Sequence, residues 1–117
     1  MVKLGKYSIG VGDRFGQQAK AQLQACIQAA EHRVELVPVW NKSNREHQII
    51  GSDPAGVYNA AATAVKVIGW TKPWHVDADH INLQTVDRFI PWSDFFTIDV
   101  ADWIGKPTSS DLVETFV

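Results

Sequence analysis

The stretch VELVPV, Val34–Val39, has the alternating and then continuous apolar character of a buried β-strand, and Pro38 predicts that it ends near Val39. It lies between two segments of helical periodicity. Upstream, apolar residues recur at helical spacing from Gln17 to His32. Downstream, Asp53-Pro54 is typical of a helix start and Gly69 of a helix end. A strand between two helices is the centre of a β-α-β-α unit, so this stretch predicts an α/β fold with a parallel sheet.

The same alternation continues towards both ends of the chain. Short apolar runs predict strands over Lys6–Val11, Trp74–Val76 and Phe95–Val100. We expect a polar loop over Trp40–Ser52 and a short helix over Leu83–Ile90, and Ser109/Ser110-Asp111 resembles another helix start. Alternating βαβ units of this kind fit either a doubly wound sheet or a (βα)8 barrel.

Composition restricts the class of protein. The chain has 117 residues, of which 45% are hydrophobic, and a formal net charge of -2, so residues 1–117 suit one small domain. No basic cluster indicates a nucleic-acid partner, and no apolar run is long enough for a membrane span or a signal peptide. Cys26 is the single cysteine, which excludes an internal disulfide. We expect a cytoplasmic protein that acts on a small molecule.

Polar side chains follow every predicted strand. Because ligands of parallel α/β sheets bind beyond the carboxyl ends of the strands, these positions are the candidate site. They are Asp13 and Arg14 after the first strand, Asn41 and Lys42 after the second, Asp77 to His80 after the third, and Asp99 after the fourth.

GVGDRFG, Gly10–Gly16, superficially suggests a dinucleotide fingerprint, but its glycines are spaced one residue too long, so we expect no nucleotide cofactor. Arg14 could instead bind a carboxylate through both of its amino groups, and a purely structural Asp13–Arg14 turn is the alternative. The next polar run, NKSNREH, Asn41–His47, is either a solvated loop or a loop suited to a sugar acid. Trp40 is a candidate for stacking against the sugar.

VDADHI, Val76–Ile81, carries the residue types needed for metal-assisted proton transfer. A neutral imidazole at His80 can bind a divalent cation, and the adjacent carboxylate of Asp79 can act as a base. In a regular strand Asp79 and His80 point to opposite faces, so they share one site only if the backbone turns there. The alternative is a hydrogen-bonded structural histidine. Asp99 could bind substrate hydroxyls or orient His80.

Four blocks of the sequence, YSIGVGDRFG, VWNKSNREH, VDADHI and FFTIDVADWIG, resemble the tagaturonate/fructuronate epimerase family in the family's order. The resemblance implies a barrel-like α/β isomerase that depends on a divalent cation and interconverts two keto-hexuronates. It implies that Asp79 is the proton acceptor and His80 a metal ligand. The expected substrate-binding residues are Asp13, Arg14, Asn41, Lys42, Arg45 and Asp99, with Asp77 in support.

Family members are substantially longer, so the resemblance implies an N-terminal portion, the first half of a TIM-like (βα)8 barrel truncated at its C-terminus. The expected partners are a small sugar acid and either a complementing C-terminal portion or a second copy of the chain. Two other interpretations stay open. One is a different metal-dependent sugar isomerase or aldolase, and the other is a non-catalytic half-barrel that binds sugar acids or a partner chain.

Overall fold

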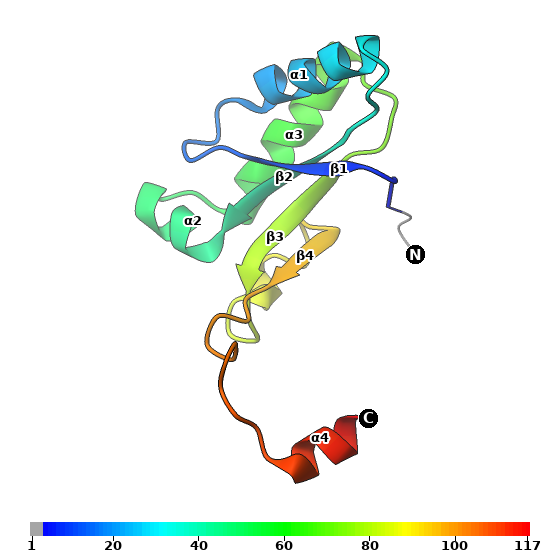
Figure 1. Ribbon diagram of the computed structural model, residues 1–117. Coiled ribbons are helices and arrows are strands. Elements are labelled where there is room, and N and C mark those ends of the chain that lie inside the picture. The colour runs from blue at the N-terminus through cyan, green and yellow to red at the C-terminus, as the bar shows by residue number, and fades with distance from the viewer. Residues whose placement is uncertain (1–3) are drawn as a thin grey trace.

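The computed structural model describes residues 4–117, which form four strands and four α-helices (Figure 1). Helical segments separate all four strands, as the apolar periodicity predicts. The elements are β1 (Ser8–Gly12), α1 (Ala19–Glu31), β2 (Val37–Ser43), α2 (Asn44–Ile50), α3 (Pro54–Ile68), β3 (His75–Ile81), the 3-10 turn η1 (Val86–Arg88), β4 (Phe95–Ile98) and α4 (Ser110–Phe116).

The four strands form one parallel sheet in the order β1-β2-β3-β4. This confirms the predicted α/β fold with a parallel sheet. Helices α1 and α3 pack together on one face of the sheet, as Figure 1 shows. The core lies between these helices and the sheet, and its buried members are Ala19, Leu23, Trp40, Ala61, Ala64 and Val76.

Helix α3 begins and ends where the sequence predicts. The Asp53 carboxylate accepts a hydrogen bond from the Gly56 backbone N–H at 2.8 Å, and Pro54 occupies the first turn, where no N–H partner is required. At the other end Gly69 adopts φ 72°, a left-handed conformation that terminates the helix. These two caps fix the length of the helix that covers the centre of the sheet.

Strand β2 begins three residues later and ends four residues later than predicted, and a helix follows it in place of the expected loop. Pro38 lies inside β2, opposite Ile9 of β1, whereas pairing with β3 begins only at Val39. Because the Val37 N–H bonds to β1 and successive N–H groups point to opposite sides, the missing N–H of Pro38 falls where no ladder bond is required. The strand therefore continues to Ser43, and α2 follows it directly.

The crossover from β3 to β4 holds much less helix than predicted. Strand β3 runs through the DADH residues to Ile81, and only η1 forms within the expected helix. The side chains of Asn82 and Thr85 bond to the backbone N–H groups of Gln84 and Asn82, which favours a turn over a helix start. Asp94 then ties the start of β4 to β3 by accepting from the Val76 N–H at 2.9 Å.

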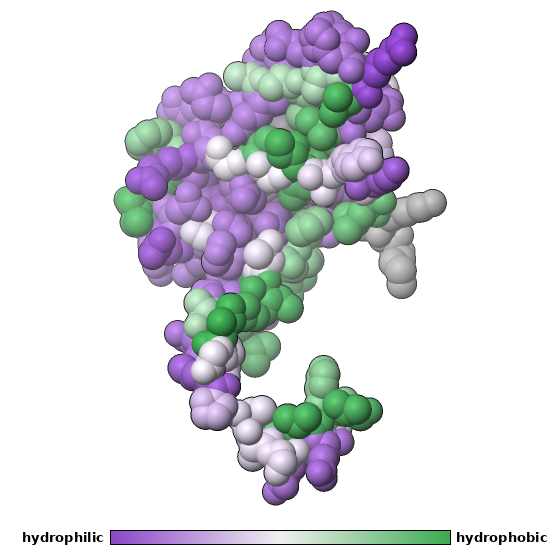
Figure 2. All heavy atoms as spheres, in the orientation of Figure 1, coloured by the Kyte–Doolittle hydropathy of each residue, from purple (hydrophilic) through white to green (hydrophobic). Residues whose placement is uncertain are grey.

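The C-terminal segment after β4 leads away from the sheet to α4, which stands apart from the other elements (Figure 1). Large apolar side chains are exposed on β4 and on this segment, and Figure 2 shows green, hydrophobic groups below the mostly hydrophilic body. They include Phe96, Ile98, Val100, Trp103, Ile104, Leu112 and Phe116. In the part of the chain that the structure describes, no helix is long and apolar enough to cross a membrane.

Candidate functional site

A cavity of about 350 Å³ opens at the carboxyl end of the sheet, and every strand contributes to it. Its lining brings together five residues that the sequence predicts for the site: Arg14 after β1, Arg45 after β2, Asp79 and His80 of β3, and Asp99 after β4. Ser43 and Glu46 complete the lining and were not predicted. Because three carboxylates, an imidazole and two guanidinium groups share one cavity, it suits a polar ligand that carries charge.

Asp79 and His80 meet because the backbone turns between them. His80 has φ 52°, one of two non-glycine residues with positive φ in the described chain, and the β3–β4 register shifts between Ala78 and Ile81. As a result Asp79 Oδ1 lies 2.7 Å from His80 Nδ1. The His80 side chain is 63% exposed and that of Asp79 16% exposed, so the imidazole reaches solvent while the carboxylate is largely enclosed.

Helix α2 is held at the cavity rim by a reciprocal cap. The Ser43 hydroxyl accepts from the Glu46 N–H at 3.3 Å, and Glu46 Oε2 accepts from the Ser43 N–H at 3.0 Å. The Ser43 backbone N–H lowers the pKa of Glu46, burial opposes this, and the charges of Lys42 and Arg14 add to the lowering. The sequence SNRE carries this capping signal, and it would have predicted the helix that places Arg45 at the cavity.

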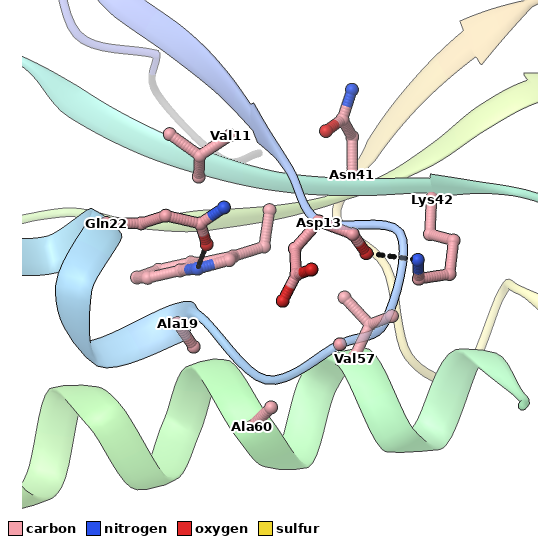
Figure 3. Close-up of a pocket in the computed structure, with 10 residues that line it drawn as sticks. Val11, Asp13, Ala19, Gln22, Asn41, Lys42, Val57 and Ala60 are labelled. Atoms are coloured by element: carbon pink, nitrogen blue, oxygen red, sulfur yellow. Dashed lines mark hydrogen bonds between the residues drawn. The ribbon is translucent and has the colours of Figure 1, made fainter.

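Lys42 holds the loop between β1 and α1 through hydrogen bonds to its backbone. Its side chain is buried, and its ammonium donates to the carbonyl oxygens of Asp13 and, at 2.9 Å, Arg14. Figure 3 shows Lys42 and Asp13 on the helix-covered side of β2, with Asn41 pointing the other way. Lys42 is therefore engaged by the backbone that carries Arg14.

Asp13 closes the same loop from the other direction. Its carboxylate accepts from the backbone N–H groups of Phe15 at 3.0 Å and Gln18 at 2.6 Å, and also from that of Gln17. Burial acts to raise the pKa of Asp13, but these backbone hydrogen bonds outweigh it and the pKa is lowered. The space beside Asp13, Asn41 and Lys42 has a volume of about 20 Å³, enough for a water molecule but not for a sugar acid.

Trp40 belongs to the core, which corrects the expectation that it stacks against a sugar. The side chain is 3% exposed, its indole N–H donates to Gln22 Oε1 at 3.1 Å, and its ring meets that of Trp74 edge-on with the ring centroids 6.0 Å apart. A residue two positions from Lys42 in a strand faces the same side, and here that side is covered by α1 and α3.

Asn41 and Asp77 occupy the sheet face that α1 and α3 leave uncovered. They are register partners on β2 and β3, and each has a buried Oδ1 without a hydrogen-bond partner among the described residues. The carboxamide of Asn41 lies over β1, where a Cβ at Gly12 would come within 3.0 Å of its Oδ1. Gly12 thus makes room for Asn41, which explains a glycine that nucleotide binding does not require.

Burial raises the pKa of Asp77, and the negative charge of Asp79 adds to this, while a hydrogen bond from Thr97 opposes it. Thr97 Oγ1 donates to Asp77 Oδ2 at 2.7 Å. Asp77 lies two residues before Asp79 on the same face of β3 and does not line the cavity.

The cavity lining contains one imidazole, that of His80. His80 Nε2 faces away from the bond that Nδ1 makes with Asp79, and an imidazole oriented by a carboxylate is a common metal ligand. Across residues 4–117, however, no group of three or more His, Cys, Asp or Glu side chains could hold a metal ion. A bound cation would need ligands in addition to those described here.

A parallel sheet with polar groups from every strand converging at its carboxyl edge defines an α/β protein of the kind that binds small polar ligands at that edge. Residues 1–115 match the tagaturonate epimerase family, UxaE, and the chain belongs to this family. None of the proteins with curated descriptions matches the sequence.

Solved structures of the fructuronate-tagaturonate epimerase UxaE from Cohnella laeviribosi are similar to this chain. The form complexed with two glycerol molecules has a TM-score of 0.73 and 25% identity. The native form has a TM-score of 0.72 and 24% identity. In both cases the match covers 94% of this chain and 23% of the solved one, so the chain spans about a quarter of the length of those relatives.

Proposed function

We propose that this chain supplies the N-terminal part of the active site of a hexuronate epimerase that interconverts tagaturonate and fructuronate. The observation that carries the proposal is the Asp79–His80 pair, 2.7 Å apart, in a strand-end cavity of a chain that belongs to the tagaturonate epimerase family. The sheet would be the first half of a TIM-like barrel. Its sequential order β1-β2-β3-β4 supports this, because a doubly wound sheet reverses its strand order at a switch point.

In the proposed reaction Asp79 is the base. The epimerised carbon lies one position beyond the α-carbon of the ketone, so abstraction of an α-proton does not invert it. Retro-aldol cleavage does: Asp79 takes the proton of the carbinol hydroxyl, the carbon–carbon bond breaks, and its electron pair passes to an enediolate. The aldehyde rotates, the bond re-forms on its other face, and Asp79 returns the proton. Direct proton exchange at the epimerised carbon is the competing route.

His80 would hold the divalent cation, through the Nε2 that Asp79 leaves free. Such a cation supplies electrostatic stabilisation of the negative charge that develops on the enediolate. Zinc, nickel, manganese and iron all accept imidazole together with oxygen ligands. The remaining ligands would come from polypeptide beyond the described residues, because those residues do not form a complete shell.

The test is an NMR assay of tagaturonate in D₂O. It is run with this chain and, separately, with a polypeptide as long as the solved relatives that contains this sequence. We expect fructuronate to form without a deuterium at the epimerised carbon, and a cleaved aldehyde to be trapped by a carbonyl reagent. Incorporation of deuterium at that carbon without a cleaved aldehyde would refute the retro-aldol route and support direct proton exchange. Turnover of a neutral ketose with none of a keto-uronate would refute the proposed substrate.

A further inference from the structure

The charges that line the strand-end cavity are sorted across the sheet. Both guanidinium groups come from the side of β1 and β2, where Arg14 and Arg45 follow the strands. The Asp79–His80 pair and Asp99 come from the side of β3 and β4. Because the sheet order is β1-β2-β3-β4, the cavity has a cationic end and an acidic end.

The two guanidinium groups are available to a ligand. Within residues 4–117 the salt bridges are Lys72–Glu35, His75–Asp94 and His80–Asp79, and the side-chain hydrogen bonds engage neither Arg14 nor Arg45. Glu46 lies in the same cavity, but its carboxylate is held by the Ser43 N–H and hydroxyl, each at 3.0 Å. Two free cations beside one engaged carboxylate leave a net positive charge at this end.

The backbone that presents Arg14 is fixed before any ligand arrives. The Lys42 ammonium bonds to the Arg14 carbonyl at 2.9 Å, and the Asp13 carboxylate bonds to the N–H of Phe15 at 3.0 Å. Arg45 is placed by the Ser43–Glu46 cap at the start of α2. A site whose backbone is held in advance loses less conformational entropy on binding.

We propose that Arg14 and Arg45 bind the carboxylate of a keto-hexuronate, so that the sugar acid lies with its carboxylate towards β1 and β2 and its reacting carbon towards Asp79. This inference rests on the proposed function. A guanidinium group matches a carboxylate with two parallel hydrogen bonds, which a neutral ketose cannot accept. The reverse orientation would place the carboxylate beside Asp79 and Asp99, where like charges repel. The cavity therefore selects acids over neutral ketoses and admits them in one direction.

The test compares binding of tagaturonate and of tagatose, its neutral counterpart, by isothermal titration calorimetry with the 117-residue protein. Arg14→Gln and Arg45→Gln should each weaken tagaturonate binding about tenfold or more, since a hydrogen bond to a charged group is a strong one. Neither should change tagatose binding. Lys20→Gln, which removes an exposed charge on α1 outside the cavity, is the matched control and should change nothing.

Circular dichroism spectra identical to that of the unsubstituted protein ensure that a loss of affinity is not a loss of fold. Unchanged tagaturonate affinity in both arginine variants overturns the assignment of the carboxylate to Arg14 and Arg45. An equal loss of affinity for tagatose overturns it too. Neither result contradicts the epimerase proposal. If the unsubstituted protein binds tagatose as tightly as tagaturonate, the selection of acids is wrong. If it binds neither sugar, both this inference and the contribution of this chain to the active site fail.

Discussion

Asp79 Oδ1 lies 2.7 Å from His80 Nδ1 although the two residues are neighbours in a strand, where side chains normally point to opposite faces. The positive φ of His80, 52°, rotates its side chain towards that of Asp79. A non-glycine residue in this conformation costs of order 1 kcal/mol or more, and such strain is concentrated at functional sites. The contact between the two side chains therefore depends on an unfavourable backbone conformation at His80.

Under the proposed mechanism, substitutions should separate the roles of the two residues in a polypeptide as long as the solved relatives that contains this sequence. We expect Asp79→Asn to retain metal but to lose turnover by about 10²–10⁴-fold, because the base is removed. His80→Ala should lose metal, with an affinity at least about 100-fold lower, since even the residues that orient a ligand contribute 10–100-fold. Metal content by mass spectrometry and epimerisation by NMR measure the two effects. His32→Ala, on the exposed end of α1, is the control, and full metal content in His80→Ala would refute the ligand assignment.

Gly12 should resist substitution more than Gly10 because of what each one faces. A Cβ at Gly12 would lie 3.0 Å from Asn41 Oδ1, whereas a Cβ at Gly10 would lie 3.6 Å from Asn41 Nδ2, an ordinary contact. Gly12→Ala should therefore lower the free energy of unfolding by about 1–3 kcal/mol, the usual cost of overpacking. Gly10→Ala should be close to neutral in the same urea titration. Equal effects at the two positions would mean that Asn41 moves freely.

Asp77→Asn should stabilise the protein at neutral pH. Burial raises the pKa of Asp77, so the carboxyl group favours folding when it is protonated, and this contribution is lost as the pH rises through its folded-state pKa. An amide avoids the buried charge and can still accept from Thr97. We expect a gain in unfolding free energy of about 1 kcal/mol at pH 7 that shrinks towards pH 4. Asp87→Asn, on exposed η1, should show no gain, and a lower melting temperature for Asp77→Asn would contradict the idea.

His47 should make the protein less stable in mild acid. Burial lowers the pKa of His47 to about 4, helped by the charges of Arg88 and Lys42 and opposed by those of Asp53 and Glu46. Between pH 6.5, the pKa of this imidazole in the unfolded chain, and about pH 4, the unfolded chain binds a proton at His47 that the folded chain does not bind. Stability should therefore fall as the pH drops through this window, by up to about 1.4 kcal/mol per pH unit.

Thermal melts from pH 7 to pH 4 measure this slope. His47→Asn keeps a polar atom near Ser52 Oγ, which lies 2.8 Å from His47 Nδ1, and should flatten it. His32→Asn removes an exposed histidine and should leave the slope as it was. If the slope survives in His47→Asn, another group carries the pH dependence.

The exposed edge of β4 should promote self-association, as a half-barrel interpretation requires. Strand β4 ends the sheet, and Ile98 on it is 67% exposed. We expect a concentration-dependent rise in mass by sedimentation velocity, and Ile98→Glu should reduce it. Val67→Glu replaces an apolar residue of similar exposure, 62% on α3, and should not reduce it. A monomer at all concentrations would rule out association through this edge.

Much of the fold is predictable from the sequence because local signals and packing agree. The apolar stripe of α1 and the Asp53-Pro54 start and Gly69 end of α3 all occur in the structure where the periodicity and capping residues place them. The predicted end of β2 was wrong because a proline interrupts a strand only where its missing N–H faces a paired neighbouring strand, and the sequence does not show which way it faces. The prediction of a helix before β4 was wrong because the side chains of Asn82 and Thr85 accept hydrogen bonds from nearby backbone N–H groups, which competes with helix formation.

The candidate site was predictable in part for a similar reason. Strand-end positions brought Arg14, Arg45, Asp79, His80 and Asp99 into one cavity. Sequence spacing could not reveal that the Lys42 ammonium bonds to carbonyl oxygens of the β1–α1 loop. A long, flexible side chain at a strand end can reach several different partners, and spacing does not say which. That Asn41 and Lys42 lie on opposite faces was missed because the strand was predicted to end at Val39, so the alternation of its side chains was not extended to these two residues.

The three consecutive residues Trp40, Asn41 and Lys42 limit how β2 can change in length. Trp40 fills the core, Asn41 lies over the glycines of β1, and Lys42 holds the loop that carries Arg14. Deletion or insertion of one residue before Trp40 would exchange the two faces, exposing the indole and burying the carboxamide against helices. Changes in length inside this strand should therefore be rejected.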